Sequence, residues 1–93
     1  MSVLKRASVR CVVGGKMEPG YGWMTAHSGR PLPEPVREVT LHIELQFEDS
    51  GYLVICTSDD PQIWCDNWYG SQEEAETAAS DVYGVRPEDW KAA

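Results

Sequence analysis

Residues 51–84 read GYLVICTSDDPQIWCDNWYGSQEEAETAASDVYG, and this stretch decides the fold because its local signals agree with one another. Residues 52–57 and 62–68 are rich in β-branched and aromatic side chains, as strands are. The residues between them include two aspartates and Pro61, which cannot donate to a strand ladder and belongs in a turn. The stretch therefore begins with an antiparallel strand pair.

The loop length sets the register of this pair. If residues 59–62 form the loop, antiparallel pairing places Cys56 opposite Cys65. On that register one face of the pair carries large apolar side chains, and we expect this face to meet a helix. Its members are Leu53, Ile55, Trp64 and Trp68.

A helix is predicted directly after the strand pair. Ser71 is a good N-cap, and Glu74 three residues later completes a capping box. Small residues then follow at helical spacing until Gly84, which favours a left-handed C-cap. Residues 87–90 add one short turn, with Trp90 folded back over the core.

Two further strands are predicted upstream. Residues 39–48 alternate strictly between apolar and polar side chains, which is typical of a sheet with one wet face. Asp49-Ser50-Gly51 supplies the turn into the next strand. Residues 7–13 show the same alternation and predict the first strand.

A Gly/Pro-rich loop, residues 16–35, separates those two strands. Loops of this length inside compact domains are usually functional or mobile. Residues 21–27 within it are compatible with a short strand hairpinned on the first one.

These elements fit one domain over residues 1–93. The predicted fold class is α+β: an antiparallel meander of four to five strands with one C-terminal α-helix packed on one face.

The formal net charge is -7 and is unevenly distributed. The first 37 residues contain six basic and two acidic residues, whereas the remainder contains two basic and thirteen acidic ones. The excess of negative charge opposes binding to nucleic acid and to anionic membranes. Two interpretations of this distribution remain open. The basic first strand lies beside acidic strands in one sheet, or the acidic residues form a face that binds a cationic partner.

Three cysteines without paired spacing are unlike a secreted disulfide scaffold and favour a reducing cytoplasm. The sequence has no apolar run of the length that a signal peptide or a membrane span needs. We therefore expect a cytoplasmic protein.

The C-terminal residues also carry a resemblance. Asp66-Asn67-Trp68, Ser71, Glu73-Glu74-Ala75, Ala78, Tyr83-Gly84-Val85 and Glu88-Asp89-Trp90 resemble a tail found in small uncharacterised bacterial proteins, of the form D-x-W-x-x-[ST]-x-E-x-A, a helix, [FY]-G-V and a terminal tryptophan. The resemblance covers roughly the last 40 residues. It implies an α+β fold and no particular activity.

No catalytic or metal-binding signature emerges. The cysteines and histidines lack the C-x-x-C and H-x-x-x-H spacings of metal sites, so we expect no metal and no cofactor. His42 lies on the predicted wet face, away from the cysteines, so it is not placed to activate a thiol. We therefore expect a protein without enzymatic activity.

The favoured function is a non-catalytic protein-binding module with a basic partner, for example an immunity or antitoxin-type protein. Its candidate contact residues are Tyr21, Trp23, Met24, Glu44, Glu48, Asp59 and Asp60. The alternative is a small-molecule binder or minor enzyme with a pocket between the sheet and the long loop, lined by Trp23, His42, Trp64 and Asp66. A third alternative is a homodimer formed through a sheet edge or the uncovered sheet face.

Overall fold

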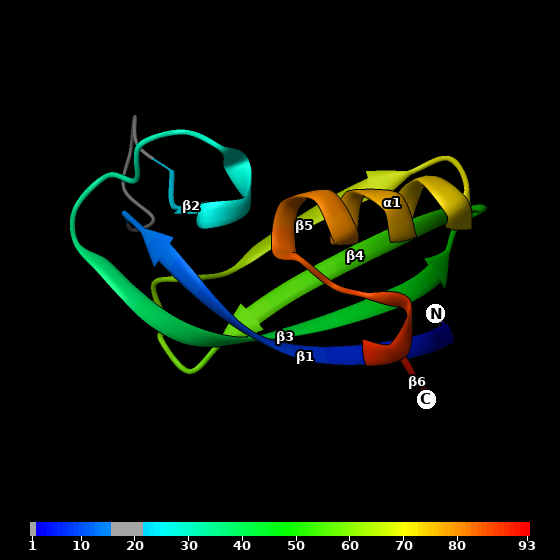
Figure 1. Ribbon diagram of the computed structural model, residues 1–93. Coiled ribbons are helices and arrows are strands. Elements are labelled where there is room, and N and C mark those ends of the chain that lie inside the picture. The colour runs from blue at the N-terminus through cyan, green and yellow to red at the C-terminus, as the bar shows by residue number, and fades with distance from the viewer. Residues whose placement is uncertain (1, 16–21) are drawn as a thin grey trace.

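The computed structural model of the chain describes residues 2–15 and 22–93. They form one antiparallel sheet with a C-terminal helix packed on one face, the α+β class expected (Figure 1). The strands are β1 (Ser2–Gly14), β2 (Met24–Thr25), β3 (Val36–Glu48), β4 (Gly51–Ser58), β5 (Cys65–Tyr69) and β6 (Lys91–Ala92). The helices are α1 (Gln72–Tyr83) and two single 3-10 turns, η1 (Ala26–Ser28) and η2 (Pro87–Asp89).

The sheet order is β2-β1-β3-β4-β5, with β6 added beside β1. The long β1 and β3 strands pair over most of their length, and β3, β4 and β5 form the expected meander. Asp49 and Ser50 both have positive φ angles, which suits the tight two-residue turn between β3 and β4. The expected pairing of Cys56 with Cys65 is confirmed.

Helix α1 begins at the predicted N-cap and ends at the predicted C-cap. The Ser71 hydroxyl oxygen accepts a hydrogen bond from the Glu74 backbone N–H, and Gly84 is a left-handed C-cap with φ 76°. Ala75 and Ala79 are fully buried, so the helix approaches the sheet through its smallest side chains. The His27 ring packs against Gly84, where a Cβ would lie 2.3 Å from its Nε2.

The core lies between α1 and the sheet face that α1 covers. Leu41, Ile43 and Leu45 of β3 supply its centre. Because the β3–β4 register pairs Ile43 with Cys56 and Leu45 with Val54, these two β4 residues also face the helix.

The expectation that Leu53, Ile55, Trp64 and Trp68 would meet the helix was wrong. Side chains alternate across a strand, so Leu53 and Ile55 lie on the opposite face from Val54 and Cys56. Trp64 is 48% and Trp68 55% exposed, since no element among the described residues covers that face.

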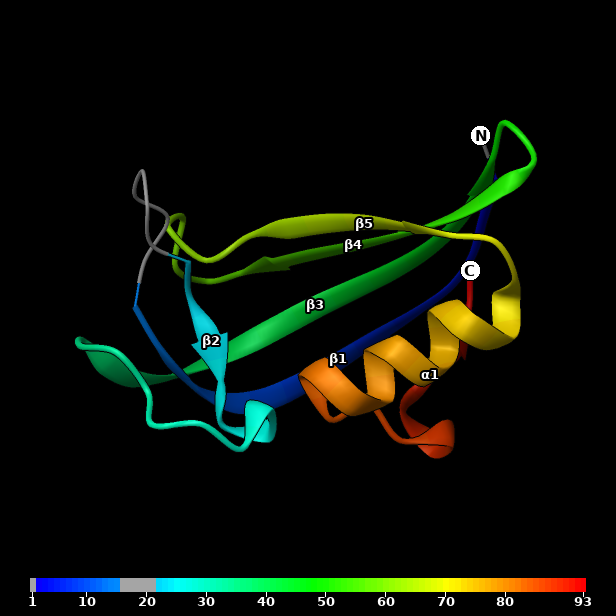
Figure 2. The ribbon, with the colours of Figure 1, turned by 90° about the horizontal axis from the view of Figure 1, so that it is seen from above.

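Both ends of the described chain lie at the same end of the sheet (Figures 1 and 2). The η2 turn follows α1, and β6 then pairs Ala92 with Lys5 of β1. Trp90 is half-buried against the core, as predicted, and the Lys5 ammonium lies 5.3 Å from the centre of its ring. The sequence did not predict β6.

Within the described residues, no helix has both the length and the apolar character needed to cross a membrane.

Candidate functional site

A cavity of about 420 Å³ lies where the loop before β2, strand β5 and the last turn of α1 come together. We call it the Trp23 pocket. Its lining is mainly apolar and comes from three separate parts of the chain. The lining residues are Gly22, Trp23, Met24, Thr25, Cys65, Asn67, Asp81, Val82 and Tyr83.

Trp23 forms one wall of this pocket and is held from two sides. Its indole N–H donates a hydrogen bond to the backbone carbonyl of Trp64 over 2.9 Å, just before β5 begins. Its ring stacks on Tyr83, with the ring centres 6.1 Å apart and the planes 24° from parallel. The aromatic residue that the sequence singled out is therefore fixed against the sheet.

The last turn of α1 closes the pocket. The Thr25 hydroxyl donates a hydrogen bond to the Val82 carbonyl, which ties β2 to the helix. Val82 itself is 45% exposed and is one of the residues that line the cavity. Burial raises the pKa of Tyr83, so its phenol stays neutral at physiological pH.

Cys65 is the half-buried thiol of the pocket, and the amide nitrogen of Asn67 donates to its sulfur over 3.3 Å. Its cross-strand partner Cys56 is fully buried, and this burial raises the pKa of the Cys56 thiol to about 12. Both thiols are free, as is Cys11, whose pKa burial also raises.

A shallow depression of about 610 Å³ runs along α1 beside the pocket. We call it the acidic depression, because three of its residues are Glu73, Glu74 and Asp81. Asp81 also lines the Trp23 pocket, so the two hollows adjoin. Among the described residues, no hydrogen bond or ion pair engages these three carboxylates.

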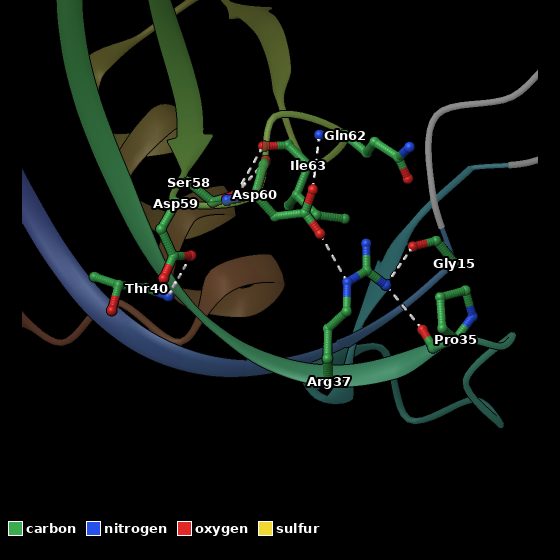
Figure 3. A network of polar contacts seen from close by, with 9 residues as sticks. All are labelled: Gly15, Pro35, Arg37, Thr40, Ser58, Asp59, Asp60, Gln62 and Ile63. Carbon is green, nitrogen blue, oxygen red and sulfur yellow. Dashed lines mark hydrogen bonds and ion pairs between the residues drawn. The ribbon is translucent and has the colours of Figure 1, made fainter.

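Two of the acidic candidates from the sequence, Asp59 and Asp60, are used inside the fold (Figure 3). Arg37 donates to Asp60 over 2.8 Å and to the backbone carbonyls of Gly15 and Pro35. Two contacts hold the pKa of Asp60 below its ordinary value. The hydrogen bond from the Gln62 backbone N–H has the larger effect, and the hydrogen bond from Arg37 has the smaller one. Asp59 accepts a hydrogen bond from the Thr40 backbone.

The other two acidic candidates lie on β3. Glu44 accepts hydrogen bonds from Gln46 and Arg6, and these hold its pKa below its ordinary value. Glu48 lies at the end of β3 that pairs with Gly51, opposite to the end that lies nearest to β2, and it does not line the Trp23 pocket. The carboxylates of Glu44, Asp59 and Asp60 are therefore engaged within the protein.

The pocket candidates from the sequence are not all brought together. Trp23 and Met24 line the cavity, whereas Trp64 contributes its backbone carbonyl and leaves its ring exposed. His42 and Asp66 are exposed and do not line the pocket; His42 bonds the Ser8 hydroxyl on the uncovered sheet face. Tyr21 lies outside the described residues.

Beyond Gly22, Thr25 and Cys65, which were not site candidates either, sequence reasoning missed four lining residues: Asn67, Asp81, Val82 and Tyr83. Asn67 has the same strand parity as Cys65, so the correct face assignment for β5 would have found it. The other three are consecutive at the C-terminal end of α1, and only the tertiary fold places them beside Trp23.

The described side chains include no group of three or more His, Cys, Asp or Glu arranged to hold a metal ion. Among the described residues that line the Trp23 pocket there is no histidine that could act as a base on Cys65. Comparison of the chain with models of known protein families, with curated proteins and with solved structures finds no match.

Proposed function

We propose that the protein is a non-catalytic binding module for a basic protein partner, and that its contact surface is the outward side of α1 with the acidic depression beside it. One observation carries the proposal. Helix α1 contains four acidic residues and no basic one, and among the described residues only Glu76 meets a counter-charge, the Lys5 ammonium at 2.6 Å.

The free carboxylates on α1 differ from two acidic residues of β3, Glu38 and Glu44. Glu38 and Glu44 face arginines of β1 across the sheet, so most of their field is cancelled nearby. Glu73, Glu74 and Asp81 have no such neighbour in the part of the chain that the structure describes. An uncompensated patch of one sign accelerates association with an oppositely charged surface and disfavours partners of like charge.

The specific form of this proposal is an immunity or antitoxin-type protein of the bacterial cytoplasm, which would cover a basic surface of a toxin. The formal charge of -7 supports a basic partner. The three free thiols support a reducing compartment.

The second candidate is a small-molecule binder. The Trp23 pocket favours it, since about 420 Å³ lies within the usual range for ligand sites and the lining is mainly apolar with few polar groups. Its walls include Gly22 and Trp23 of the Gly/Pro-rich loop and Cys65 of the sheet, which supports this alternative.

The test of the first candidate neutralises the three free carboxylates. The variant Glu73→Gln/Glu74→Gln/Asp81→Asn is compared with the wild type as immobilised bait in bacterial cell extract, at low and high salt. We expect the wild type to retain basic proteins that salt elutes, and the variant to lose them.

A matched control removes three negative charges elsewhere, in Glu34→Gln/Glu48→Gln/Asp49→Asn. It has the same net charge as the test variant but keeps α1 intact, so it should retain the partner. Equal capture by both triple variants, or no salt-sensitive partner with the wild type, would contradict the proposal.

A further inference from the structure

The Trp23 pocket has room for one large side chain of a partner. Its walls are the Trp23 and Tyr83 rings with Met24 and Val82, and it opens to solvent at the exposed Val82. Aromatic anchors in such pockets supply a large share of the binding energy at protein interfaces.

The polar groups around the pocket select for positive charge. The Thr25 hydroxyl donates its hydrogen to the Val82 carbonyl, and the Asn67 amide nitrogen donates one of its two hydrogens to the Cys65 sulfur. Asp81 remains with a carboxylate that no described residue engages. Asp81 is the charged side chain among the described lining residues, and a cationic donor satisfies its carboxylate best.

The acidic depression continues from Asp81 towards Glu74 and Glu73. Asp81 and Glu74 are seven residues apart on one helix, which corresponds to about 10 Å along its axis. An extended chain covers that distance in about three residues. One linear segment can thus place an apolar side chain in the pocket and two cations along the helix.

We propose that the Trp23 pocket and the acidic depression together receive an extended basic segment of the partner protein. Its aromatic or large aliphatic residue fills the pocket, a neighbouring basic residue meets Asp81, and a second basic residue about three positions further meets Glu74 and Glu73. This inference rests on the proposed function and adds the sequence pattern that the partner must carry.

The test measures fluorescence polarisation with labelled peptides at low salt. The pattern peptide contains Trp-Lys-Ser-Ser-Lys, and its reverse is measured beside it. One comparison peptide replaces Trp with Ala, and another moves the second Lys next to the first. We expect the Ala peptide to bind at least about tenfold more weakly and the respaced peptide to bind more weakly than the pattern peptide.

Two protein variants test whether the preference for the Trp peptide over the Ala peptide arises in the pocket. Val82→Lys fills the cavity with a cation and should abolish the preference for Trp over Ala. Val12→Lys makes the same change at an exposed valine of β1 that does not line the pocket, and should retain the preference. Binding of the pattern peptide should also shift the Trp23 indole N–H resonance, assigned with Trp23→Phe, and slow alkylation of Cys65.

The outcomes separate the two proposals. Salt-sensitive binding that is equal for the Trp and Ala peptides overturns the pocket inference and leaves the basic-partner proposal standing. Absence of salt-sensitive binding by every cationic peptide overturns both. Binding of free tryptamine as tight as that of the pattern peptide overturns the peptide assignment and makes the pocket a small-molecule site.

Discussion

The indole N–H of Trp23 donates a hydrogen bond to the backbone carbonyl of Trp64, although 41 residues separate them in the sequence. This bond joins the Gly/Pro-rich loop to the beginning of β5. Because the acceptor is a backbone atom, the bond depends on the Trp23 side chain and not on the Trp64 side chain.

Trp23→Phe keeps an aromatic ring for the stack on Tyr83 but removes the N–H. We expect the free energy of unfolding to fall by about 1 kcal/mol, measured by urea denaturation. Trp64→Phe alters only an exposed ring and keeps the acceptor, so it should change that free energy by less than about 0.5 kcal/mol. Equal losses in the two variants would contradict the role given to the indole.

Gly84→Ala should destabilise the protein by at least about 1 kcal/mol, because φ 76° is unfavourable for any residue with a Cβ. The new methyl would also overlap the His27 ring. Thermal unfolding of His27→Ala/Gly84→Ala separates the two causes, since the first substitution removes the ring and leaves the backbone strain. If the loss of stability in the double variant equals the sum of the losses in His27→Ala and Gly84→Ala, that result would argue against the ring contact.

Asp60 should contribute to acid sensitivity. Its pKa is lowered in the folded protein by the Gln62 N–H and by Arg37, so its stabilising effect is fully present above the unfolded pKa of about 3.9 and is lost as pH falls through the lower folded value. In urea denaturation from pH 7 to pH 2, Asp60→Asn should lose less stability below about pH 4 than the wild type. Asp59→Asn is the matched control, because it removes the neighbouring carboxylate and leaves the contact between Asp60 and Arg37 in place.

Cys65 should be the first thiol to react with iodoacetamide under native conditions. It is half-buried in the Trp23 pocket, whereas Cys56 is fully buried. With a pKa of about 12, only roughly one Cys56 thiol in ten thousand is ionised at pH 8. Peptide mapping should show Cys65 modified in the native protein and Cys56 and Cys11 only in urea. Early labelling of Cys56 in the Cys65→Ser variant would mean that the core opens locally.

The sequence predicted those features of the fold that depend on local chemistry. Ser71 and Gly84 delimit α1 because capping requires only neighbouring backbone groups. The alternation in residues 39–48 places Leu41, Ile43 and Leu45 in the core, since one side of a strand can be read from its own pattern. The pairing of Cys56 with Cys65 followed from loop length.

The prediction of which face of β4 meets α1 was wrong. It relied on the size of the apolar side chains and did not use the register between β3 and β4. A two-residue turn at Asp49-Ser50 pairs Leu45 with Val54, which turns Val54 and Cys56 towards α1 and places Leu53 and Ile55 on the opposite face of the sheet. The alanine stripe of α1 is compatible with these smaller partners. The register of the neighbouring strand is thus the stronger guide.

The candidate site was only partly predictable for a related reason. Trp23 was identified from its glycine-rich surroundings, but Val82 and Tyr83 belong to a helix whose sequence gives no sign of the loop that it contacts. Asp81 lines both the Trp23 pocket and the acidic depression, and this position depends on the tertiary fold. The functions assigned to these residues remain the proposals made above.

The two ends of the described chain lie beside each other at one end of the sheet. Lys5 pairs with Ala92 at one end of the sheet, whereas β2 lies at the opposite end (Figure 2). A protein tethered to a sensor surface through either end would therefore display the Trp23 pocket away from the support. Copies joined head to tail by short linkers would present several such sites, and a partner with repeated basic segments would be held by avidity.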